Sequence, residues 1–249
     1  VLGIADNTEH LWSYDFTAGA LTQLTFEAAN RSAIWSADGQ RVTFASNRNG
    51  PFNLFSVAPT AEGVIDRLTT ADALQLPGSW SPDGELLAFM EQHPTTGRDV
   101  WIRKKNGERI AFADSPADES APRFSPDGRW IAYVSNETGQ PEVYVRPANA
   151  AAPPRRITSV GASEPVWRGD GSALFFRSYG KTFVTPLAGG SPRVVVERLM
   201  EPGTFDAAGY DVIGGTDRFL MMASAAATAT SAELRIILNW SPAAISSSQ

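Results

Sequence analysis

Cysteine is missing from this chain of 249 residues, which excludes disulfide bonds, thiol nucleophiles and thiolate metal ligands in one step. Histidine is scarce as well, because the sequence contains only His10 and His93 and neither has a second ligand at metal-binding spacing. The Gly-x-Ser-x-Gly elbow of α/β hydrolases and the Gly-x-Gly-x-x-Gly loop of nucleotide enzymes do not occur. The sequence therefore disfavours both of those enzyme classes.

Positive charge and long apolar runs are also in short supply. The chain has 21 Lys and Arg against 27 Asp and Glu, a net charge of -6, and its basic residues are scattered rather than gathered in a stripe. Such a distribution predicts no nucleic-acid partner. No apolar run reaches the length of about 18 residues that a membrane-spanning helix needs, so we expect no membrane insertion.

What the chain does contain is a repeated turn. The turn consists of an aromatic residue, then Ser or Arg, then one further residue and Asp-Gly, and a β-rich segment follows it. It occurs four times, at Asp38-Gly39, Asp83-Gly84, Asp127-Gly128 and Asp170-Gly171. Successive Asp-Gly pairs are 45, 44 and 43 residues apart. Asp can bond nearby backbone N–H groups and Gly accepts positive φ, so each unit is predicted to be a hairpin. A period of about 40–45 residues with about four strands in each unit is typical of a β-propeller.

The rest of each repeat supplies two more strands. Predicted third strands begin at Asn53, Asp99, Glu142 and Thr182. Predicted fourth strands follow a Pro/Gly/Ala-rich turn and end in the segments 67–69, 109–111, 156–158 and 193–196. Tryptophans recur at equivalent places in the repeats, so we expect them to pack between blades. They include Trp12, Trp35, Trp80, Trp101 and Trp167.

The two ends hold incomplete units, since the first lacks its inner strand and the last, closing at 233–240, lacks its outer one. We predict an all-β chain with a single β-propeller domain over 1–240, made of six blades of four-stranded antiparallel sheets, or five if the end segments combine. The approximate blades are 1–27, 31–72, 77–114, 121–160, 164–198 and 205–240. The Ala/Ser-rich tail 241–249 has little to bury and is predicted to be disordered.

The candidate site residues come from the inner strands, whose first residues are expected to gather at the mouth of a central channel. Counting back five or three residues from each aromatic, on one side of the strand by period-two alternation, selects Asn30, Gln75, Glu119 and Glu164 as ligand-binding candidates. Glu119 and Glu164 are the metal-ligand candidates, because carboxylate and amide oxygens suit Ca²⁺ or another hard divalent cation. The alternative interpretation is that these side chains are solvated residues lining the channel or hydrogen-bond partners for exposed strand ends.

The repeats resemble the TolB-type β-propeller family, with its WD-like Pro-Asp signature, at 80–89 and 124–133 and at 142–147. More narrowly, 121–147, 164–167 and 237–240 resemble the carboxy-terminal propellers of bacterial serine/threonine protein kinases, although no kinase motif is present. The resemblance implies a bacterial protein-interaction module and favours a periplasmic or extracytoplasmic location. Gly169 departs from the pattern, since it replaces the Pro at the fourth turn.

Two functions from different classes remain open, and the sequence does not decide whether the chain is an enzyme. The first is a binding module for a protein, peptide or small ligand at the channel face. The second is a metal-dependent hydrolase of esters, lactones or phosphotriesters, with Glu119 or Glu164 as ligand or base and His10 or His93 assisting. We expect a monomer, or a dimer through unpaired terminal blade edges.

Overall fold

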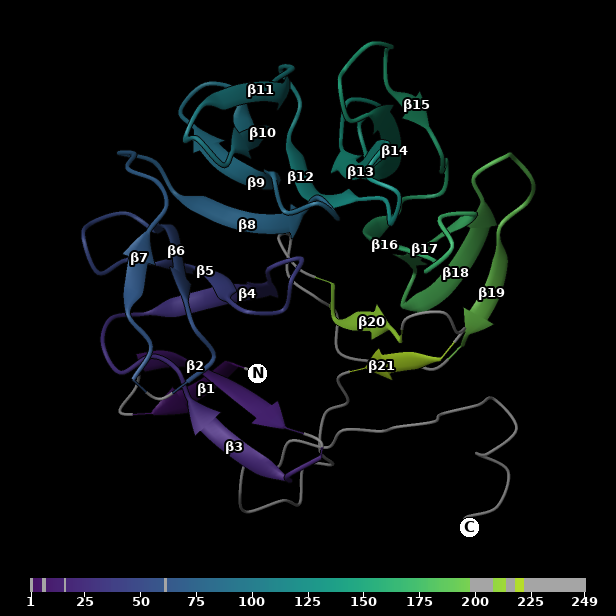
Figure 1. Cartoon of the computed structure of the whole chain (residues 1–249). Coiled ribbons are helices and arrows are strands. Elements are labelled where there is room, and N and C mark those ends of the chain that lie inside the picture. The colour runs from purple at the N-terminus through teal and green to yellow at the C-terminus, as the bar shows by residue number, and fades with distance from the viewer. Residues whose placement is uncertain are drawn as a thin grey trace. The chain divides into compact units, whose positions relative to one another are not determined.

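The computed structural model describes residues 2–5, 8–15, 17–60, 62–197, 208–213 and 218–221. All regular elements among them are strands, and they form two compact units, Val1–Phe124 and Ser125–Gln249 (Figure 1). The unit boundary falls inside the third of the four Asp-Gly repeats, between its first and second strands. Within the described residues, no helix has the length and apolar character needed to cross a bilayer. The predicted strand at 233–240 and the predicted tail lie outside the described residues.

The first unit contains three sheets with strand orders β1-β2-β3, β4-β5-β6-β7 and β11-β10-β9-β8, followed by strand β12. The three-stranded sheet at the start agrees with the expected lack of an inner strand there. The bounds are β1 Leu2–Ala5, β2 Thr8–Asp15, β3 Ala20–Gln23, β4 Asn30–Trp35, β5 Val42–Ser46, β6 Asn53–Val57, β7 Ile65–Arg67, β8 Gln75–Trp80, β9 Leu86–His93, β10 Gly97–Lys104, β11 Arg109–Ala113 and β12 Glu119–Phe124.

The second unit has strands β13 to β15, a four-stranded sheet β16-β17-β18-β19 and a pair β20-β21. All pairings within both units are antiparallel, as the hairpin pattern predicts. The bounds are β13 Trp130–Ser135, β14 Glu142–Pro147, β15 Arg155–Arg156, β16 Ser163–Trp167, β17 Ala173–Ser178, β18 Lys181–Pro186, β19 Arg193–Val196, β20 Tyr210–Val212 and β21 Phe219–Met221.

The Asp-Gly turns form the predicted hairpins between first and second strands. In the turn after β8, Ser81 Oγ donates to Asp83 Oδ1 at 2.5 Å, and the same carboxylate accepts from the backbone N–H of Glu85 at 3.1 Å. Gly84 lies at φ +73, and the glycines of the other three turns lie between +68 and +72. Because that conformation costs glycine nothing, the turn chemistry alone closes each hairpin.

A threonine fixes the end of the fourth strand in three repeats. The Oγ1 atoms of Thr25, Thr69 and Thr158 accept the backbone N–H of Leu11, Leu54 and Val143 at 2.9, 3.0 and 2.9 Å. Each bond joins the third strand to the segment that leaves the sheet, so it satisfies a buried backbone donor beyond the last ladder bond.

The core lies between successive sheets of each unit. One cluster in the first unit combines Leu54 of β6 with Leu87 and Phe89 of β9, all 0% exposed. The expected packing role fits Trp80, whose Nε1 donates to Thr43 Oγ1 at 3.0 Å, but not Trp35, which is 54% exposed. The structure offers no account of the exposure of Trp35.

Candidate binding site

The predicted site residues begin the inner strands, but they are buried. Asn30, Gln75 and Glu119 are the first residues of β4, β8 and β12 in the first unit, and they are 0%, 0% and 2% exposed. Strand β4 contacts β8, which in turn contacts β12. Glu164, in β16 of the second unit, is also buried. The side chains of these four residues are therefore not solvated residues lining a channel.

The alternation used to choose these residues is wrong, because the inner strands contain β-bulges. In β4, Arg31 lies opposite Ala45 while Ile34 lies opposite Thr43, so two residues oppose one. The bulge places Ser32 at φ +55, and Glu164 of β16 lies at φ +56 in the same repeat position. A bulged residue interrupts the pleat, so residues two apart no longer share one side of the strand.

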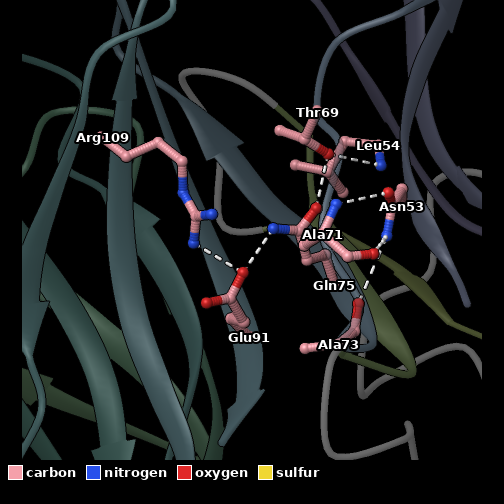
Figure 2. Close-up of polar contacts among 8 residues, drawn as sticks. All are labelled: Asn53, Leu54, Thr69, Ala71, Ala73, Gln75, Glu91 and Arg109. Atoms are coloured by element: carbon pink, nitrogen blue, oxygen red, sulfur yellow. Dashed lines mark hydrogen bonds and ion pairs between the residues drawn. The ribbon is translucent and has the colours of Figure 1, made fainter.

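Gln75 belongs to a hydrogen-bonded chain that crosses from one sheet to the next (Figure 2). Thr69 Oγ1 donates to Gln75 Oε1, Gln75 Nε2 donates to Glu91 Oε2, and Arg109 Nη2 donates to the same Glu91 oxygen, each at 2.5 Å. The guanidinium of Arg109 also lies 4.8 Å from the ring centroid of Trp101. The amide is thus fully engaged in holding β8 to its neighbours.

Asn53 is likewise hydrogen-bonded within the protein, to the backbone of the adjacent loop. Its Oδ1 accepts the backbone N–H of Ala71 at 2.9 Å, and its Nδ2 donates to the carbonyls of Ala71 and Ala73 at 3.1 and 3.2 Å (Figure 2). The corresponding residue of the next sheet is Asp99, which is 3% exposed and lies opposite Glu91. Burial raises the pKa of Asp99, although a hydrogen bond from Thr96 Oγ1 at 3.1 Å opposes that shift.

The two glutamates predicted as metal ligands have protein partners in separate units. Ser115 Oγ donates to Glu119 Oε1. Glu164 Oε2 accepts the backbone N–H of Gly209 at 2.7 Å, and its Oε1 lies 3.8 Å from Arg177 Nε, with both side chains 6% exposed. Both carboxylates stabilise the local fold. Their joint role as ligands stays a prediction.

The histidines lie in different environments of the first unit. His10 of β2 is 6% exposed, whereas His93 ends β9 on the surface, where its Nδ1 lies 3.0 Å from Thr95 Oγ1. Over the described ranges, no group of three or more His, Asp or Glu side chains is arranged to hold a metal ion.

Two features escaped the sequence reasoning. Arg48, in the β5–β6 loop, lies 5.1 Å from the ring centroid of Phe55, and Arg67 of β7 lies 5.7 Å from the same centroid. Tyr179, in the β17–β18 hairpin, is 85% exposed at φ +49. For Arg48, the sequence contained a signal that could have identified it, because Arg48 departs from the repeat. It stands where the related segment Ser135–Gly139 has Glu137.

No protein-family model matches the chain. Among curated proteins, it is 35% identical over 106 residues to tricorn protease homolog 1 of Streptomyces coelicolor, an overlap that covers 40% of this chain and 9% of that protein. It is 27% identical over 146 residues to the Tol-Pal system protein TolB of Francisella tularensis, covering 57% of this chain and 33% of TolB. The chain thus spans a third or less of the length of these relatives.

Solved structures with the same fold include two TolB proteins. The putative TolB of Agrobacterium tumefaciens matches with a TM-score of 0.66 at 18% identity, covering 74% of this chain and 73% of that one. TolB of Acinetobacter baumannii matches with a TM-score of 0.67 at 16% identity, covering 81% and 53%. The narrower resemblance to kinase propellers stays a prediction. Together with the four-stranded antiparallel sheets, these matches show that the chain has a β-propeller fold similar to that of the TolB proteins.

Proposed function

We propose that this chain is a protein-binding module and that Tyr179 is one of its contact residues. The supporting observation is the combination of exposure and strain at this residue. Tyr179 and Gly180 form a two-residue loop between the paired residues Ser178 and Lys181, with φ of +49 and +75. Positive φ at both loop residues is the geometry of a type I′ turn, whose first position favours Asn, Asp or Gly.

A tyrosine at this position brings no benefit to the isolated sheet. Its conformation costs about 1–2 kcal/mol for an L-residue, and its ring is left in water. Ser178 Oγ donates to the carbonyl of Val160 at 3.1 Å, which joins the hairpin to a loop whose Val160 is itself 41% exposed. Exposed aromatic residues on rigid loops are typical anchors of protein interfaces.

The hairpin also lies at the predicted end of its sheet. The residues that open β16 are paired with the end of β17, since Ser163 lies opposite Arg177. The β17–β18 loop therefore belongs to the sheet end where the inner strand begins, the end that the sequence assigned to the channel face. Loops at one end of a propeller sheet are its usual place for recognition.

The proposal is tested by selecting binders from a displayed library of 12-residue peptides and measuring their affinities by fluorescence anisotropy. We expect Tyr179→Asn to weaken binding at least about tenfold. The control Val64→Asn, at a side chain 75% exposed in the first unit, should not change the affinity. Wild-type affinity in Tyr179→Asn, or no selectable peptide, would overturn the proposal.

The same variant separates loss of binding from loss of folding. Asn is favoured at the first position of a type I′ turn, so Tyr179→Asn should stabilise the hairpin by about 0.5–1 kcal/mol and raise Tm. A more stable protein that binds less tightly assigns the tyrosine to recognition. A lower Tm in this variant would show that the ring supports the fold instead.

A further inference from the structure

Two arginines of the first unit share one aromatic ring, and neither has an acidic partner among the residues that the structure describes. The guanidinium carbons of Arg48 and Arg67 lie 5.1 and 5.7 Å from the ring centroid of Phe55. Phe55 lies opposite Phe44 of β5 on one side and opposite Arg67 of β7 on the other. Cross-strand partners project from the same face of a sheet, so Phe55 and Arg67 share that face.

Both guanidinium groups are held in place by neutral acceptors. Arg48 donates from Nε to Ser46 Oγ at 3.0 Å and from Nη2 to Asn30 Oδ1 at 3.1 Å. Arg67 donates from Nη2 to Asn53 Oδ1 at 2.7 Å and from Nε to the carbonyl of Thr69 at 2.8 Å. Neither arginine forms an ion pair with any residue that the structure describes. Each keeps one Nη1 amino group for another acceptor.

In the neighbouring sheet, the positive charge of an arginine over aromatic rings is balanced by a carboxylate. There Arg109 of β11 also lies over an aromatic pair, 5.3 Å from Phe89 and 4.8 Å from Trp101, but its Nη2 is 2.5 Å from Glu91 Oε2. Glu91 lies opposite Gln75, as Ser46 lies opposite Asn30. Ser46 therefore occupies the position of the missing carboxylate.

The related segment of the second unit also contains a carboxylate that the first unit lacks. The segment Ser46-Asn47-Arg48-Asn49-Gly50 matches Ser135-Asn136-Glu137-Thr138-Gly139 of the second unit. There Glu137 provides the negative charge, and its charge acts on Tyr144, the partner of Arg156 across β14 and β15. An arginine in place of that glutamate changes the local charge by two units.

Such a pair of cations is costly for the isolated chain. Burial lowers the pKa of Arg48, while the charge of Glu27 opposes the shift without forming an ion pair. Arg67 is exposed, so the pair is open to solvent on one side. Stacking on an aromatic ring offsets only part of the desolvation of a guanidinium.

We propose that Arg48 and Arg67 form a site for a carboxylate of an acidic partner segment, an inference that rests on the protein-binding function proposed above. Because Nε and Nη2 of both arginines already donate within the protein, each Nη1 amino group is the donor for a carboxylate oxygen, through a charge-assisted N–H···O bond. Arg48 lies in the β5–β6 loop, which corresponds in the repeat to the β17–β18 loop of Tyr179. The two loops thus occupy the same end of their respective sheets.

The test uses peptides recovered from the displayed library and their matched Glu→Gln and Asp→Asn versions. We expect the recovered peptides to contain acidic residues, and Arg48→Gln to weaken their binding at least about tenfold. Arg41→Gln is the matched control, because Arg41 pairs with Asp66 in the same sheet and its loss changes the net charge equally. Arg48→Gln removes the donors to Ser46 Oγ and Asn30 Oδ1, so its Tm is measured in parallel and its affinity is compared only at temperatures where circular dichroism shows it folded.

Four results would contradict the inference. Peptides that bind equally well without their acidic residues, or that bind Arg48→Gln as tightly as Arg41→Gln, overturn it while leaving the binding function in place. Displacement of the peptides by inorganic phosphate but not by an equal concentration of glutarate would assign the site to phosphate instead. Failure to recover any peptide removes the proposed function as well.

Discussion

Gly97, in the β9–β10 hairpin, is the position where a single methyl group should be most informative. It lies at φ +96, and a Cβ added there would be 2.3 Å from Asp118 Oδ1. That carboxylate accepts the backbone N–H of Arg98 at 2.9 Å and its guanidinium Nε and Nη2 at 3.3 and 3.2 Å. Because the carboxylate is held at three points, it must break these bonds to make room for alanine.

The penalty for Gly97→Ala has two parts. An L-residue at this φ costs about 1–2 kcal/mol. Displacing the Arg98–Asp118 pair, whose side chains are 25% and 35% exposed, adds about 1 kcal/mol. The expected total is about 2–3 kcal/mol. Gly50→Ala is the control. Gly50 lies at φ +121 in the first unit, and nothing lies within 4 Å of its added Cβ, so backbone strain is the whole cost of this substitution.

Urea unfolding followed by circular dichroism measures both changes, and a double-mutant cycle with Asp118→Ala separates the two parts. In the Asp118→Ala background, the Gly97→Ala penalty should fall to about that of Gly50→Ala. If removing Asp118 leaves the penalty unchanged, the contact between the methyl group and the carboxylate is not its cause, and the reasoning fails.

Three further predictions concern the turns, the threonine contacts and metal binding. The hydrogen bond from Ser125 lowers the pKa of Asp127 from 3.8 to about 2, so its contribution to stability is present above about pH 4 and is lost as the pH falls through about 2. A carboxyl NMR titration checks this, and Asp127→Asn should flatten the pH dependence. Thr69→Val should cost about 2–3 kcal/mol because the buried N–H of Leu54 and Oε1 of Gln75 both lose their partner, whereas Thr69→Ser should cost less. Metal analysis and chelator treatment should reveal no bound divalent cation and no change in Tm; chelator-sensitive ester hydrolysis that disappears in Glu119→Gln would favour the hydrolase instead.

The sequence predicted those parts of the fold that short segments determine. The Asp-Gly hairpins follow from a few adjacent residues, because Ser81, Asp83 and Gly84 supply both the hydrogen bonds and the positive φ of the turn. The third strands follow from alternation and from their first polar residue, and each fourth strand includes the arginine of its predicted segment. For such segments the local preference and the native structure agree, so periodicity is enough.

The candidate site could not be predicted with the same success, because its geometry depends on residues far apart in the chain. Nothing local marks Ser32 for φ +55, which arises where β4 pairs irregularly with β5. Likewise, Gln75 is polar and was expected at a channel mouth. Its burial depends on Glu91 and Arg109, which reach it only through the pairing of β8 with β9 and the stacking of the arginine on Trp101.

Comparison of the repeats with one another gives more information on function than any one of them alone. Residues that recur, such as Thr69 and Thr158, make the same hydrogen bond in each sheet and therefore hold the fold. A residue that departs from the repeat and that the fold does not need at that position is a candidate for another role. Arg48 replaces an acidic residue and forms no ion pair in the described chain, and Tyr179 takes a turn position at which it is strained and exposed. Because each departure costs free energy in the isolated protein, the binding function proposed above would give both a physical reason.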